Sequence, residues 1–184
     1  ESTANALAEL RHQLIYATPV LLHKPFKFDE VADRLFAGRN PLTMQDIESL
    51  VARGVTHILS LYEGWEWERS DRFGREAVAT IERMGLQRVL RPITDGGAPT
   101  ETDFDTAWEC LNSWFDQPNT SVYVHCRAGH ERTGAILIAC YARKHGVHRY
   151  KAKELLRQAR PKIKLLPEQR AATIAWLSKH GIVE

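Results

Sequence analysis

The sequence has few cysteines and lacks long hydrophobic runs, and both shortages exclude classes of protein. It contains 3 cysteines among 184 residues, without a CxxC pair, which argues against a disulfide-stapled secreted protein and for a reducing compartment. Its longest apolar stretch, 135–142, is far shorter than the roughly 18 residues that a membrane helix requires. Repeats, low-complexity tracts and Cys/His metal patterns are also missing. We therefore expect a cytoplasmic protein with no integral membrane contact and with no metal or other cofactor.

The composition is that of a globular protein: 43% of the residues are hydrophobic and 26% are charged. At this length a single domain is expected. Residues 1–30 are interpreted as an N-terminal helical extension packed on a domain that spans 31–184, because apolar residues recur at helical spacing between Ala4 and Leu14. The chain begins at Glu1 rather than Met, which predicts that an upstream segment was processed or omitted.

Net charge is only +2, which does not favour a nucleic-acid partner, but the charges are unevenly distributed. The segment 143–170 is rich in Lys and Arg, whereas 95–116 carries acidic residues and no basic ones. The favoured interpretation of such runs is a solvated helix face. The alternative is a positive field that gathers anionic substrates.

Hydrophobic patterning predicts strands that alternate with helices. The expected strands are 34–37, 55–61, 86–93 and 121–125, and the expected helices are 43–53, 75–84, one that starts after Thr100, 133–145, 148–160 and 168–180. Thr43 with Asp46, and Thr100 with Asp103, are spaced as capping boxes. This alternation is typical of an α/β fold in which a central, mostly parallel sheet is flanked by helices.

The segment 125–134, HCRAGHERTG, carries the most chemical information. A β-branched strand ends at the cysteine, a loop containing Gly129 follows, and Arg132 and Thr133 open a helix. Backbone N–H groups of such a loop, with the positive end of the helix, surround an anion such as phosphate or sulfate. Arg132 adds a planar fork that binds two phosphate oxygens at once.

The same positive field acts on Cys126. A helix N-terminus beside a guanidinium stabilises the thiolate, which is the nucleophilic form of cysteine. The alternative for any single cysteine is a small buried hydrophobic residue, and this is the favoured interpretation of Cys110 and Cys140, which lie within helical patterns. For Cys126 we expect a nucleophile.

These residues resemble the signature of the cysteine-dependent protein tyrosine and dual-specificity phosphatase superfamily, His-Cys-x5-Arg-Ser/Thr. The signature lies late in a short chain, which is most similar to the compact dual-specificity group and implies its α/β fold. The resemblance implies a phosphatase that forms a cysteinyl-phosphate on Cys126, with Arg132 and the loop amides holding the phosphate oxygens.

The resemblance also implies roles for three further residues. The general acid lies on a loop about thirty residues upstream of the cysteine, which points to Asp95 in ITDGGAPT; the alternative for Asp95 is a turn-forming role. Thr133 is expected to donate a hydrogen bond to the departing thiolate, and His125 to position the loop through a backbone hydrogen bond.

Three other residues have weaker assignments. Asp103 and Asp105 are fallback candidates for the general acid. Gln169 follows Pro167 near the place where some family members keep a water-positioning glutamine, but a surface position on its helix is the favoured interpretation.

The variable loop positions bear on the substrate. They are interpreted as substrate-binding residues, namely Arg127, Ala128, Gly129, His130 and Glu131. In similar loops basic residues read additional phosphates, a role open to Arg127 and His130. The equally weighted alternative has these two facing solvent and Glu131 paired with a neighbouring arginine. Trp65 and Trp67 are expected to pack locally rather than to form an aromatic wall at the mouth of the site.

The expected substrate is therefore a phosphoprotein or a phosphoinositide or inositol phosphate. Two alternatives stay open: an RNA 5′-triphosphatase that uses the basic segment 143–170, and a catalytically silent phosphate-binding module. The RNA 5′-triphosphatase is disfavoured because the sequence lacks a basic groove with interleaved aromatic residues, which would bind the RNA backbone. The second is disfavoured by the joint presence of Cys126, Arg132 and Asp95.

Overall fold

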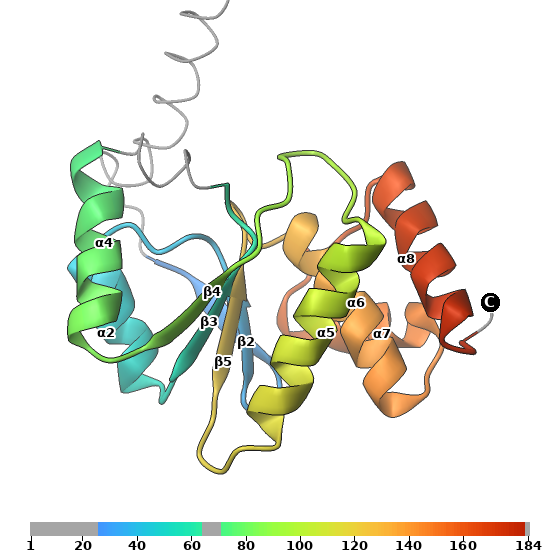
Figure 1. The fold of residues 1–184 in the computed structure, drawn as a ribbon, viewed down its shortest axis with the longest axis horizontal. Coiled ribbons are helices and arrows are strands. Elements are labelled where there is room, and N and C mark those ends of the chain that lie inside the picture. Colours follow the sequence, from blue (N-terminus) through green and yellow to red (C-terminus); the bar gives the residue numbers. More distant parts are fainter. Residues whose placement is uncertain (1–25, 64–70, 183–184) are drawn as a thin grey trace, which may run out of the picture.

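The fold is a three-layer α/β sandwich around a single five-stranded sheet. The structure is a computed structural model that describes residues 26–63 and 71–182. The sheet has the order β1-β2-β5-β3-β4 (Figure 1). The strands are β1 (Phe28–Ala32), β2 (Leu35–Gly38), β3 (His57–Ser60), β4 (Gln87–Leu90) and β5 (Val122–His125).

Four of the five strands are parallel, which confirms the mostly parallel sheet predicted from the sequence. Strand β5 is central and pairs in parallel with both β2 and β3. All four of its residues are buried, because helices cover both faces of a parallel sheet and its strands then consist of continuous hydrophobic residues.

Strand β1 is the exception, and it begins within the segment that the sequence analysis assigns to the N-terminal extension. It pairs antiparallel with β2, so that Phe28 lies opposite Gly38 and Glu30 opposite Phe36. Residues 28–30, which the sequence pattern places in the N-terminal extension, therefore belong to the sheet. The predicted helix between Ala4 and Leu14 lies outside the described residues.

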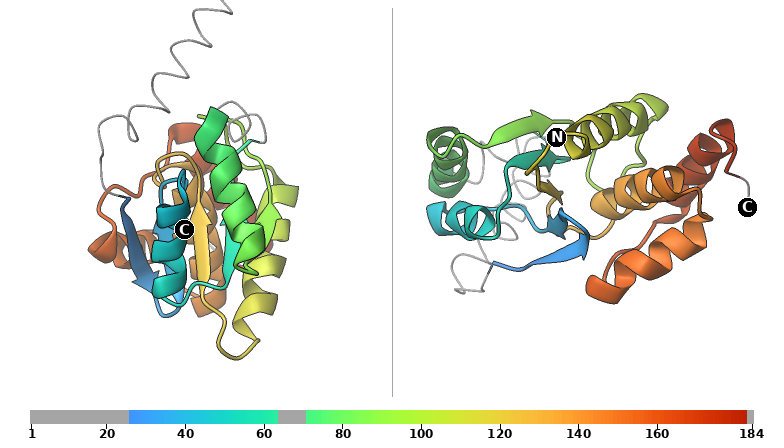
Figure 2. Two further views of the ribbon diagram at one scale, coloured as in Figure 1. Left: turned by 90° about the vertical axis from the view of Figure 1, so that its left-hand side faces the viewer. Right: turned by 90° about the horizontal axis from the view of Figure 1, so that it is seen from below.

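Helices pack on both faces of the sheet (Figures 1 and 2). One face carries α2 (Met44–Ala52) and α4 (Asp71–Arg83); the other carries α5 (Glu101–Phe115), α6 (Arg132–His145), α7 (Arg149–Ala159) and α8 (Pro167–Lys179). Each face buries its own hydrophobic cluster. Both predicted capping boxes are present, Thr43 with Asp46 at α2 and Thr100 with Asp103 at α5.

The parallel strands place their carboxyl ends along one edge of the sheet, where α/β proteins bind ligands. The loop after β5 leads into α6 at this edge, and the segments after β3 and β4 lie beside it.

Within residues 26–63 and 71–182, none of the helices has both the length and the apolar character needed to cross a bilayer. Across the same residues no group of His, Cys, Asp and Glu is arranged to hold a metal ion.

Candidate active site

Cys126 lies at the base of the loop between β5 and α6. Its side chain is buried, and its Sγ accepts a hydrogen bond from the N–H of Gly129 at 3.3 Å. Gly129 has φ +69°, and a Cβ there would lie 2.0 Å from the carbonyl oxygen of Gly38. Only glycine fits this position, because its lack of a Cβ lets the loop turn its N–H groups toward the sulfur.

Helix α6 begins directly at this loop. Its first helical hydrogen bond runs from the N–H of Ala135 to the carbonyl of Glu131 at 2.8 Å. The N–H groups that precede Ala135 in the first turn therefore point along the helix axis toward the loop. Together with the helix dipole, they form an anion site beside Cys126.

Arg132 is buried, with 1% of its surface exposed. Its Nη1 donates to the carbonyl oxygens of Ile93 at 2.8 Å and Leu61 at 3.4 Å, and its Nη2 donates to Oδ1 of Asp95 at 2.9 Å. These contacts come from the segments after β3 and β4. They hold the guanidinium in one orientation at the edge of the sheet, as bidentate phosphate binding requires.

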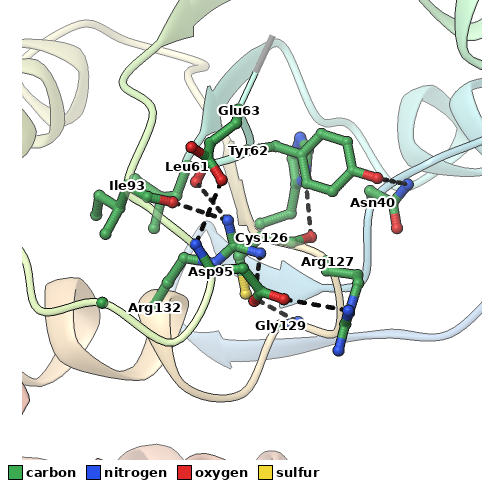
Figure 3. Close-up of polar contacts among 12 residues, drawn as sticks. Asn40, Leu61, Tyr62, Glu63, Ile93, Asp95, Cys126, Arg127, Gly129 and Arg132 are labelled. Atoms are coloured by element: carbon green, nitrogen blue, oxygen red, sulfur yellow. Dashed lines mark hydrogen bonds and ion pairs between the residues drawn. The ribbon is translucent and has the colours of Figure 1, made fainter. Parts of the chain in front are cut away.

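The carboxylate of Asp95 lies between two arginines (Figure 3). One oxygen contacts Nη2 of Arg132 at 2.9 Å, and the other contacts Nη1 of Arg127 at 3.1 Å. The backbone N–H of Asp95 donates to Oε2 of Glu63 at 3.3 Å. Asp95 is thus brought to the cysteine loop across a long stretch of sequence. The sequence does not predict this contact of Glu63, because its only distinguishing feature there is its position after a buried strand.

The pairing of Arg127 with Asp95 is a contact that the sequence did not indicate. The guanidinium of Arg127 contacts the acid loop, and about a third of the side chain is exposed. Recognition of a second phosphate by Arg127 stays a prediction.

His125 contacts the cysteine loop from the last position of β5. It is fully buried, its Nε2 lies 2.8 Å from Oγ of Ser60, and its Nδ1 lies 3.2 Å from the carbonyl oxygen of Cys126. Burial lowers the pKa of His125 to about 3, so the imidazole is neutral at physiological pH. These contacts match the expected positioning role.

Thr133 is also completely buried, and its Oγ1 has no hydrogen-bond partner among the described residues. A buried hydroxyl without a partner is costly. A hydrogen bond from this hydroxyl to the sulfur of Cys126 would give it a partner. This is the contact that the sequence analysis expects when the thiolate departs.

Arg160 is a site residue that the sequence did not reveal. At the end of α7 it donates from Nε to the carbonyl of Gly129 and from Nη2 to that of Ala128, both at 2.9 Å, and Nη1 pairs with Asp29 of β1 at 2.6 Å. Because Arg160 binds the carbonyl groups of the loop, the N–H groups of the same peptides are left to face Cys126. The signal was its four-residue spacing from buried Leu156, which places it on the buried stripe of α7.

We expect Arg160→Met to weaken phosphate and vanadate binding by about 10-fold and to lower the free energy of unfolding by roughly 2 to 4 kcal/mol, since two buried carbonyls lose their donors. Vanadate titration and urea unfolding measure the two effects. Arg157→Met, an exposed position on the same helix, is the matched control. Equal vanadate affinity of the two variants would contradict the assignment.

His130 and Glu131 form the side of the loop that faces the α7–α8 connection. The carbonyl of His130 accepts from the N–H of Lys164 at 3.3 Å, and Glu131 pairs with Nζ of Lys164 at 2.8 Å. Glu131 therefore pairs with a lysine rather than with the expected arginine. Burial, and then the charges of Arg160, Lys162 and Lys164, lower the pKa of His130 to about 4.

A neutral His130 predicts that substrate selection does not change with pH near neutrality. The folded pKa lies below the ordinary value of about 6.5, so the ring stays uncharged from about pH 5.5 to 7.5. We expect the preference for polyphosphorylated over singly phosphorylated substrates to be constant across this range, and an NMR titration to place the His130 midpoint near 4. A midpoint near 6.5 would restore His130 as a pH-dependent phosphate ligand.

The fallback acids have structural partners. Asp103 caps α5 and pairs with Nε of Arg91 at 2.7 Å, and Asp105 accepts from Nε1 of Trp176 at 2.8 Å.

The two other cysteines fit a packing role: Cys140 is buried, which raises its thiol pKa to about 12, and Cys110 is half-buried. Trp65 and Trp67 lie outside the described residues.

Gln169 corrects another expectation, because it is buried rather than on the surface of its helix. Its Nε2 donates to the carbonyl of Gly97 at 2.9 Å, and its Oε1 accepts from the N–H of Leu166 at 3.1 Å. The signal was four-residue spacing again, since Gln169, Thr173 and Leu177 share the buried face of α8.

A strand, a cysteine loop and an arginine at the start of a helix, on a mostly parallel sheet, define a compact phosphatase of the dual-specificity type. A family comparison agrees: residues 31–181 match the family described as PTP-SAK, the Swiss Army Knife protein DSP-PTPase phosphatase domain. The chain belongs to this family, and it is a phosphatase domain.

Solved structures share the fold at low sequence identity. PTPMT1 in complex with PI(5)P has a TM-score of 0.70 at 18% identity, covering 84% of this chain and 96% of that one. Tk-PTP in its active form has a TM-score of 0.72 at 20% identity, covering 83% and 97%. Human DUSP28 has a TM-score of 0.65 at 18% identity, covering 84% and 95%. These likenesses establish the dual-specificity phosphatase fold.

Proposed function

We propose that the protein hydrolyses phosphate monoesters through a cysteinyl-phosphate intermediate on Cys126. The observation that carries this proposal is the convergence of three groups from two segments: the Cys126 thiol and the Arg132 guanidinium between β5 and α6, and the Asp95 carboxylate after β4. A nucleophile, an anion site and a proton donor are the groups that phosphoryl transfer from an ester to a thiol needs.

In the first step the thiolate of Cys126 attacks phosphorus in line, and the S–P bond forms as the ester P–O bond breaks. The leaving oxygen takes the electron pair of that bond and a proton from Asp95. Arg132 and the loop N–H groups hold the remaining phosphate oxygens and stabilise their charge in the transition state.

In the second step Asp95 accepts a proton from a water molecule that attacks phosphorus. The P–S bond breaks, and inorganic phosphate and the Cys126 thiolate are released. Thr133 supports this step because its buried hydroxyl lacks a partner among the described residues and is free to donate to the departing sulfur.

Substrate binding must displace Asp95 from Arg132. In the structure the carboxylate holds Nη2 of Arg132 at 2.9 Å, and a phosphate dianion has the stronger attraction to this guanidinium. Asp95 then keeps Arg127 as its charged neighbour, at 3.1 Å. Arg127 is thus paired with the proposed general acid, and this ion pair accounts for its presence in the loop without a second phosphate.

For the substrate we propose a phosphoprotein, on Tyr, Ser or Thr, or a phosphoinositide or inositol phosphate. The positive charges of Arg160, Lys162 and Lys164 outweigh the negative charge of Glu131 at His130, on the side of the loop, and a net positive field gathers anionic substrates of either kind. The structural relative PTPMT1 was solved with PI(5)P, which supports including phosphoinositides among the candidates.

Turnover of para-nitrophenyl phosphate by the purified protein, with vanadate as inhibitor, tests the proposal. Acid quenching during turnover should leave a phosphate adduct on the peptide that contains Cys126. Comparing kcat/KM for phosphotyrosine peptides, phosphoserine or phosphothreonine peptides, phosphoinositides and soluble inositol phosphates then selects the substrate class. Phosphate binding without turnover of any of these would identify a catalytically silent module instead.

A further inference from the structure

Gln169 connects the start of α8 to the loop that carries the proposed general acid. Its side chain is 0% exposed. Both ends of its amide are used: Oε1 accepts from the N–H of Leu166 at 3.1 Å, and Nε2 donates to the carbonyl of Gly97 at 2.9 Å. A buried amide with both ends bonded has one orientation, which fixes where the Gly97 carbonyl lies.

The Gly97 carbonyl belongs to a tight turn that contains Asp95. The N–H of Gly97 donates to the carbonyl of Thr94 at 2.8 Å, and Gly96 has φ +75°, a left-handed conformation that glycine adopts without strain. Because the turn closes on itself, the Gly97 carbonyl cannot move far without moving Asp95. The Gln169 hydrogen bond therefore acts on the position of the Asp95 carboxylate.

The contact with Gln169 differs from the carboxylate's contact with Arg132. A substrate phosphate competes with Asp95 for Arg132, so that contact is lost when the site is occupied. The bond between Gln169 and Gly97 joins an uncharged amide to a backbone carbonyl, and a phosphate, which carries no donor that replaces the amide and is drawn to cations, does not compete for it.

We propose that Gln169 is a positioning residue that holds the 94–97 turn, and with it Asp95, over Cys126 while phosphate occupies Arg132. This inference rests on the proposed function, in which Asp95 is the proton donor. It assigns Gln169 to the acid loop through its backbone, and not to a water molecule.

The first test is the dependence of the Gln169→Met defect on the leaving group. Met has nearly the same length and fills the same space, but it cannot donate to Gly97. We expect kcat/KM, which reports phosphoryl transfer to Cys126 and not the later hydrolysis of the shared intermediate, to fall about 10-fold for phenyl phosphate. For para-nitrophenyl phosphate, whose leaving group needs little protonation, kcat/KM should stay within about 2-fold. Equal losses on both substrates would overturn the proposal, because a merely structural defect does not discriminate between leaving groups.

Thr173→Val is the matched control. Thr173 is buried on the same helix, one turn from Gln169, and its hydroxyl donates to the Gln169 carbonyl at 2.8 Å. This variant weakens α8 but leaves the bond to Gly97 in place, so we expect wild-type rates on both substrates. A leaving-group-dependent loss in Thr173→Val would assign the effect to α8 stability and contradict the role of the amide.

Two further variants keep the test decisive. Gln169→Glu retains an acceptor for Leu166 and, when ionised, lacks the donor to Gly97; at about pH 8 it should reproduce the loss on phenyl phosphate even if the Met variant folds poorly. In an Asp95→Asn background, Gln169→Met should cause no further loss on phenyl phosphate, because the group that it positions is already inactive. An additive loss would overturn the proposal.

Amide hydrogen exchange separates this inference from the proposed function. With phosphate bound, exchange at residues 95–97 should be at least 10-fold faster in Gln169→Met than in the wild type and unchanged in Thr173→Val. This readout needs no turnover, so faster exchange in a protein without phosphatase activity would leave the positioning role standing and reject only the function. Unchanged exchange would overturn the positioning role itself.

Discussion

Replacing Cys126 with serine is expected to abolish turnover while phosphate-ester binding is retained. The hydroxyl fills nearly the same space as the thiol, which accepts the Gly129 N–H at 3.3 Å, so the anion site formed by the loop and Arg132 should persist. Serine is a poor nucleophile at neutral pH, because a neutral hydroxyl attacks phosphorus far less readily than a thiolate does.

The expected loss is large, since removing a covalent nucleophile elsewhere costs roughly a million-fold in rate. Single-turnover assays with para-nitrophenyl phosphate measure the rate, and vanadate titration measures binding. Cys110→Ser, which alters the half-buried cysteine of α5, is the matched control and should retain full activity. Residual activity of Cys126→Ser above about 1% of the wild type would rule out the covalent mechanism.

The fold was predictable where local patterns and burial agree. The strand 121–125 and the helix after Arg132 form close to the predicted residues, because a continuous β-branched run and a helical apolar pattern each favour one structure. Strand β1 was not predicted. Its sequence, FDEVA, is only partly buried, and its pairing with β2 is a nonlocal contact that no short-range pattern encodes.

The centre of the site was predictable because its chemistry lies within one loop. Cys126, Gly129 and Arg132 are close in sequence, and the requirements of an anion site restrict each of them to one residue type. The supporting residues were not predictable in the same way. Arg160 and Gln169 act through backbone carbonyls on distant segments, and only the register of α7 and α8 shows that their side chains point inward.

The roles at the rim of the site were incompletely predictable for an electrostatic reason. Sequence alone gives a side chain its ordinary pKa and no neighbours, so phosphate binding and a solvent-facing position were equally open for Arg127 and His130. In the folded protein Arg127 is paired with Asp95 at 3.1 Å, and burial with three neighbouring cations keeps His130 neutral. Which groups carry a usable charge depends on their neighbours in space.

Replacing Asp95 with asparagine is expected to lower kcat/KM for phenyl phosphate, which reports transfer of the phosphoryl group to Cys126, by roughly 10²- to 10⁴-fold, the usual contribution of a positioned general acid. Asparagine has the same shape, and its amide oxygen still accepts a hydrogen bond from Arg127 or Arg132, so the 94–97 turn should stay in place. What it lacks is a proton to give to the leaving oxygen.

The loss should therefore depend on how much the leaving group needs that proton. On para-nitrophenyl phosphate, whose phenolate is a stable leaving group, Asp95→Asn should be only modestly slower than the wild type, whereas on alkyl phosphates the loss should be largest. Asp105→Asn, at a carboxylate bonded to Trp176, is the control and should show no such dependence. If Asp95→Asn is equally slow on nitrophenyl and alkyl esters, the proton comes from elsewhere. In that case Asp95 serves only to neutralise Arg132 and Arg127 before the phosphate arrives.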